Sequence, residues 1–77
     1  MKIRFDHVAA LTAEMTGLSA DTITPESRVV EDLNADSIDV VELLMLFEDE
    51  YDLSIPDEVA KACPTVGQIH AWLEANT

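Results

Sequence analysis

The stretch at residues 31–51 reads EDLNADSIDVVELLMLFEDEY. It begins with turn-forming residues and continues with apolar residues three or four positions apart, the spacing of one face of an α-helix. Asp36 suits the N-cap position, because its carboxylate can accept a hydrogen bond from a free amide of the first turn. We therefore predict a helix that begins at Asp36 or Ser37 and continues to about Tyr51.

This predicted helix has two apolar faces. The face expected to line the core collects Val40, Leu43, Leu44, Phe47 and Tyr51. Ile38, Val41 and Met45 fall on roughly the opposite face, beside the acids Glu42 and Asp49. Either the helix is buried almost all round, or this second face binds partner proteins. The acids favour a partner-binding face, because burial of unpaired carboxylates is unfavourable.

The rest of the chain predicts three further helices and no strand. A first helix is expected from Ile3 to Thr16, with Gly17 as its stop. Pro56-Asp57-Glu58 is typical of the start of a short third helix, which Pro64 ends. Thr65-Val66-Gly67-Gln68 matches a capping box at the start of a fourth helix. The predicted fold is an all-α four-helix bundle with one short helix and a long loop.

That loop separates the first helix from the second, over residues 19–36. It is rich in turn-prone residues, and a loop of this length is unusual in a compact domain unless it is functional. We expect Ile23, Val29, Val30 and Leu33 to hold it against the core.

Size and charge restrict the possible functions. The 77 residues suffice for a single domain, 1–77, and leave little room for a deep substrate cavity with a catalytic apparatus. The chain holds 16 Asp and Glu residues against 4 Lys and Arg, for a formal net charge of −12. This charge repels nucleic acid and anionic lipid and attracts proteins with basic patches. The alternative is that the acidity only provides solubility.

Cys63 is the only cysteine, which excludes an internal disulfide and suits a reducing compartment. The basic residues near the N-terminus precede no long apolar run, so no signal peptide is predicted, and no apolar stretch approaches transmembrane length. We expect a monomer that does not insert into membranes and lies in the cytoplasm or in an equivalent organelle interior.

Residues 31–43 closely resemble the attachment motif of the acyl carrier proteins, and further matches to that family follow at residues 47–51 and 55–58. The resemblance covers nearly the whole chain. It implies that a phosphopantetheinyl transferase joins the 4'-phosphopantetheine of coenzyme A to the Ser37 hydroxyl, with support from Asp36. Acyl groups are then carried as thioesters on the thiol of that arm, and the chain itself is not an enzyme.

The resemblance also implies a partner-binding surface for basic synthases, reductases and acyltransferases. Its positions in this chain are Ile38, Asp39, Val41, Glu42, Met45, Glu48 and Asp49. Two residues depart from the family's usual pattern. Ile38 replaces a leucine, which alters the shape of the first apolar contact, and Asn34 replaces a glycine, although Asn tolerates a left-handed backbone. Both changes weaken the interpretation of this chain as a general fatty-acid carrier rather than a carrier dedicated to one pathway.

Other cargoes and other classes of protein stay open at this point. An aminoacyl, peptidyl or D-alanyl carrier would use the same arm, and a plain acidic adaptor domain would use none. If the cargo is an alkyl chain, we expect it to enter the bundle near Leu44, Phe47 and Ile69.

Catalytic and metal-binding patterns are missing from the sequence. His7 and His70 are isolated, and we expect them to pack or to lie on the surface. An EF-hand loop that began at Asp32 would need Gly sixth and Glu twelfth, where this chain has Ser37 and Leu43. No specific metal site is predicted, only weak binding of Mg2+ or Ca2+ to the acid clusters.

Overall fold

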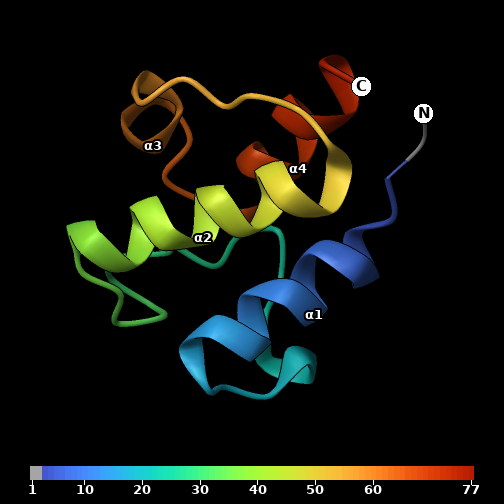
Figure 1. Ribbon diagram of the computed structural model, residues 1–77. Coiled ribbons are helices and arrows are strands. Elements are labelled where there is room, and N and C mark those ends of the chain that lie inside the picture. Colours follow the sequence, from blue (N-terminus) through green and yellow to red (C-terminus); the bar gives the residue numbers. More distant parts are fainter. Residues whose placement is uncertain (1–2) are drawn as a thin grey trace.

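The computed structural model describes residues 3–77. Its elements are α1 (Phe5–Thr16), the short 3-10 helix η1 (Ala20–Thr22), α2 (Ser37–Tyr51), α3 (Glu58–Ala62) and α4 (Val66–Ala75). The described residues contain no β-strand, only one isolated bridge between Arg28 and Thr65. The predicted all-α bundle, with its short third helix and its long loop, is therefore confirmed (Figure 1). No helix within residues 3–77 combines the length and apolar character that a membrane span requires.

The helix ends follow local capping chemistry. Gly17 ends α1 with a φ of 77°, a left-handed conformation that favours glycine. The predicted capping box of α4 is present, because Thr65 Oγ1 accepts a hydrogen bond from the Gln68 amide and the Gln68 side chain accepts one from the Thr65 amide. Two helices begin later than the sequence predicted. Helix α1 begins at Phe5 rather than Ile3, and α3 begins at Glu58 rather than at Pro56.

The core forms where α1 packs against α2 and α4. Several of the largest side chains in this core are fully buried. They are Phe47 and Leu43 of α2, Val8 of α1, and Ile69 and Leu73 of α4. The predicted core face of α2 is correct except at its end, where Tyr51 is only partly buried. Its hydroxyl forms a 2.9 Å hydrogen bond with His7 Nδ1 of α1, so this ring joins two helices at the edge of the core.

The loop between α1 and α2 is anchored at three of the four predicted positions. Ile23, Val29 and Leu33 are buried, but Val30 is 56% exposed, so its predicted core position is wrong. Residues 28–33 close a turn in which the Leu33 amide donates to the Arg28 carbonyl. Val29 and Leu33 face inward from this turn, which leaves Val30 on its outer side.

The same loop is bound to the start of α4 by its backbone. The Val66 amide donates to the Ser27 carbonyl and the Gly67 amide to the Pro25 carbonyl, each at 3.0 Å. At Gly67 the approach is so close that a β-carbon would lie 2.7 Å from the Pro25 oxygen. The loop is thus held at α4 before it reaches Ser37.

Candidate functional site

The N-terminus of α2 is fixed by a reciprocal cap. The Asp36 carboxylate accepts a hydrogen bond from the Asp39 amide at 2.9 Å, and the Asp39 carboxylate accepts one from the Asp36 amide at 3.2 Å. Asp36 has an extended backbone, so the helix begins at the next residue. This confirms the predicted N-cap and places Ser37 at the first helical position.

Ser37 is exposed, and its hydroxyl makes no hydrogen bond to any other residue of the described range. It stands where the first-turn amides of α2 point out of the helix and where the helix dipole favours a negative charge. A reagent in solution can therefore reach this hydroxyl, and the amides and dipole of α2 would attract an anionic group attached there.

The segment that leads to Ser37 is ordered by one arginine. The Arg28 guanidinium donates to both carboxylate oxygens of Asp32, at 3.3 and 3.2 Å, and pairs with Glu31. The hydrogen bond from Arg28 lowers the pKa of the Asp32 carboxyl from its ordinary value. Asn34 follows with a φ of 58°, the left-handed conformation that the sequence pattern allowed there.

The second apolar face of α2 lies in solvent. Ile38, Val41 and Met45 are 67%, 50% and 56% exposed, and the neighbouring acids Glu42 and Asp49 are exposed as well. The alternative of a helix buried almost all round is therefore excluded. This exposed face, from Ile38 to Asp49, is called the α2 outer face below.

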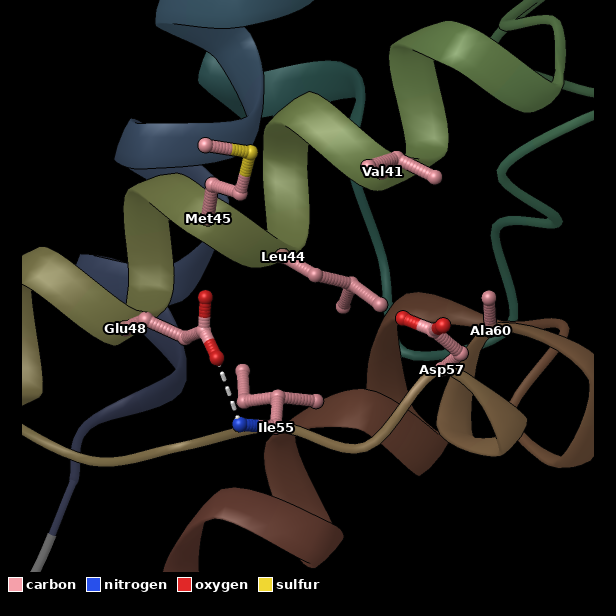
Figure 2. Close-up of a pocket in the computed structure, with 7 residues that line it drawn as sticks. All are labelled: Val41, Leu44, Met45, Glu48, Ile55, Asp57 and Ala60. Carbon is pink, nitrogen blue, oxygen red and sulfur yellow. Dashed lines mark hydrogen bonds between the residues drawn. The ribbon is translucent and has the colours of Figure 1, made fainter.

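Two of the residues predicted to bind partners also hold the fold together. Asp39 is partly buried and completes the cap of α2. Glu48 is partly buried, and one of its carboxylate oxygens accepts a 2.7 Å hydrogen bond from the Ile55 amide, as Figure 2 shows. The three-residue spacing of Asp36 and Asp39 could have indicated the first role. The Glu48 contact depends on how the chain returns after α2, and no local pattern signals it.

A small cavity of about 80 Å³ lies between α2 and α3. Its walls are Val41, Leu44, Met45, Glu48, Ile55, Asp57 and Ala60 (Figure 2). Three residues were predicted to contact an alkyl chain. Leu44 lines this cavity, whereas Phe47 and Ile69 are buried in the core and do not line it.

A more open hollow adjoins Ser37 itself. It is lined by Val30, Ser37, Val40, Val41, Asp57, Ala60 and Lys61, and it shares three of these residues with the cavity between α2 and α3. The apolar walls come from α2, from α3 and from the outer side of the loop. Sequence reasoning missed Val30, Ala60 and Lys61 as site residues, because only the tertiary fold brings them next to Ser37.

The histidines and the cysteine have packing roles. His7 contacts Tyr51 and Glu50, and the His70 Nε2 donates to the Ile3 carbonyl at 2.6 Å. Burial raises the pKa of the Cys63 thiol, which disfavours its reactive thiolate form. Residues 3–77 include no group of three or more His, Cys, Asp or Glu side chains placed to hold a metal ion.

Comparison with known proteins identifies the family. The family model described as a phosphopantetheine attachment site matches residues 6–73. The acyl carrier protein of Helicobacter hepaticus is 47% identical over 72 residues, which cover 94% of this chain and 95% of the relative. The acyl carrier protein of a Picosynechococcus species is 45% identical over 64 residues, which cover 83% of this chain and 79% of the relative.

A solved structure agrees with these relatives. The acyl carrier protein of Enterococcus faecalis, described for its high thermal stability, matches with a TM-score of 0.80 at 34% identity. The match covers 95% of this chain and 92% of that protein. The chain therefore belongs to the acyl carrier protein family. It is a carrier rather than an enzyme, and its cofactor is phosphopantetheine, which supplies the thiol that holds acyl groups.

Proposed function

We propose that Ser37 is the residue that carries the 4'-phosphopantetheine arm. The supporting observation is the unpaired, exposed Ser37 hydroxyl at the capped start of α2, inside the matched range 6–73. The phosphodiester would lie against the first-turn amides of α2, which favour an anion. Asp36 supports attachment by holding this turn in place, since its carboxylate binds the Asp39 amide.

The α2 outer face is proposed as the surface that partner enzymes bind. Its apolar residues are exposed in a row and bordered by Glu42 and Asp49, which suits a partner with an apolar contact surrounded by Arg and Lys. The net charge of −12 would also steer basic partners toward the chain. The proposed partners are a phosphopantetheinyl transferase and the synthases, reductases and acyltransferases of a biosynthetic pathway.

The proposed cargo is an acyl chain of fatty-acid or related biosynthesis. The observation that favours it is the cavity between α2 and α3, whose walls are mainly apolar and which shares Val41, Asp57 and Ala60 with the hollow at Ser37. We further propose that the 77 residues act as one carrier domain, as a monomer, in the cytoplasm.

The test is an intact mass spectrum after incubation with coenzyme A, Mg2+ and a broad-specificity phosphopantetheinyl transferase. The parent protein should gain one phosphopantetheine, and Ser37→Ala should gain none. Ser54→Ala is the matched control, because Ser54 is also exposed but lies beyond α2, and it should load like the parent. If the parent stays unmodified while a known carrier is loaded in the same mixture, the proposal is wrong.

A further inference from the structure

Lys61 differs from the other basic residues of the described chain. Arg4 pairs with Asp6 at 3.1 Å, and Arg28 pairs with Glu31 and Asp32. Within residues 3–77, the Lys61 ammonium has no such partner. An unpaired cation is unexpected on a chain with a net charge of −12, where carboxylates are plentiful.

The position of Lys61 relates it to Ser37. Lys61 belongs to the last turn of α3 and lines the same hollow as Ser37, the first residue of α2. In Figure 1, α3 lies beside the half of α2 that begins at Ser37, which agrees with the mixed lining of this hollow. Asp57, one turn before Lys61, also lines the hollow, but the structure shows no ion pair between the two.

We propose that Lys61 is a positioning residue for the prosthetic group and pairs with the phosphodiester that joins the arm to Ser37. This inference rests on the proposed function, because it requires the arm to be attached there. A lysine places a point charge on a flexible four-carbon stem, so it can follow a phosphate without a fixed geometry. The remaining walls of the hollow, Val30, Val40, Val41 and Ala60, are apolar and suit the methyl-bearing first part of the arm.

The charge balance supports this pairing. Attachment adds a further negative charge to a chain that is already strongly acidic, and the added charge is repelled by its neighbours. The capping carboxylates of Asp36 and Asp39 stand beside the attachment point. A cation in the same hollow offsets part of this repulsion. Lys61 is exposed, so the attraction is partly screened by water and by salt.

The test compares thermal unfolding before and after the arm is attached, for the parent, Lys61→Gln, Lys61→Arg and Arg4→Gln. Arg4→Gln is the matched control, since it removes the same charge from an exposed site outside the hollow. The change in midpoint on loading should be less favourable in Lys61→Gln than in the parent by about 1–5 °C, as expected for one surface ion pair in a domain of this size. Lys61→Arg and Arg4→Gln should respond to loading as the parent does.

A direct readout accompanies the unfolding data. In NMR spectra, loading should shift the side-chain resonances of Lys61, and the phosphorus resonance of the arm should differ between the parent and Lys61→Gln. Both differences should shrink as salt is added.

The outcomes separate the two proposals. Equal responses of Lys61→Gln and Arg4→Gln to loading, with no shift of the Lys61 resonances, would show that Lys61 does not hold the phosphate, while attachment at Ser37 would stand. Failure of the parent to load, seen by mass, would overturn both proposals. The unloaded variants should unfold near the parent's midpoint, because Lys61 and Arg4 are exposed.

Discussion

Glu48 shows how one side chain can serve both the fold and a surface. It belongs to the predicted partner-binding positions, yet its carboxylate binds the Ile55 amide at 2.7 Å and forms a wall of the cavity between α2 and α3. Ile55 is buried, and the bond fixes the segment that returns from α2 toward α3. The carboxylate is therefore less available to a partner than that of Glu42, which is exposed on the same helix.

Replacement of Glu48 tests this contact. Glu48→Ala leaves the Ile55 amide without its acceptor, and we expect the free energy of unfolding in urea to fall by about 1–2 kcal/mol. Glu48→Gln keeps an acceptor oxygen and should lose less. Glu42→Ala is the control and should stay within about 0.5 kcal/mol of the parent. Equal losses in Glu48→Ala and Glu42→Ala would contradict the anchoring role.

Asp36 combines a structural role with a proposed functional one, and two substitutions separate them. Asp36→Ala removes the cap of α2 and should cost about 1 kcal/mol of unfolding free energy. Asp36→Asn keeps an oxygen that can accept from the Asp39 amide, so its stability should be close to that of the parent. If the charge itself serves the transferase, Asp36→Asn should still load more slowly in the mass assay. Parent-like loading of Asp36→Asn would limit Asp36 to the cap.

At the scale of elements, the contact between α4 and the loop that joins α1 to α2 helps to position Ser37. The loop's backbone meets the first turn of α4 at Pro25 and Ser27, and Gly67 permits this close approach. Gly67→Ala would improve helix propensity by about 1 kcal/mol in an open helix. Here the new β-carbon would lie 2.7 Å from the Pro25 oxygen, a backbone atom that cannot simply rotate away.

We therefore expect Gly67→Ala to be destabilising by about 1–3 kcal/mol in urea unfolding, because the clash outweighs the gain in propensity. Ala71→Gly, at an exposed position of the same helix, is the control and should cost only the propensity difference of about 1 kcal/mol. A more stable Gly67→Ala protein would mean that the loop and α4 can separate at little cost.

The elements also show how far sequence reasoning reaches. The starts of α2 and α4 could be predicted, because the side chains that cap them lie within three residues of each other. The two faces of α2 could be assigned by periodicity, and the acids indicated which face meets water. The outward position of Val30 could not be predicted, because it depends on the turn that Arg28 and Leu33 close. Lys61 was missed for a similar reason: the packing of α3 against α2 brings it to Ser37 across a long separation in sequence.

At the scale of the whole molecule, charge opposes compactness. The net charge of −12 is spread over a chain of 77 residues, and the hydrogen bond from Arg28 lowers the pKa of the Asp32 carboxyl. Folding brings the other carboxylates closer together than they are in the unfolded chain. The repulsion among these carboxylates therefore lowers the free energy of unfolding, and dissolved ions can weaken this repulsion.

Addition of millimolar Mg2+ or Ca2+ should therefore raise the melting temperature. We expect divalent ions to bind weakly between neighbouring carboxylates of the folded chain and to stabilise it by mass action, although residues 3–77 include no preformed metal cluster. We expect a rise of about 2–5 °C, which corresponds to roughly 0.5–1 kcal/mol for a domain of this size. NaCl at matched ionic strength is the control, because it screens charge without bridging carboxylates. If NaCl produces the same rise, the effect is screening alone, and the acid clusters do not bind divalent ions.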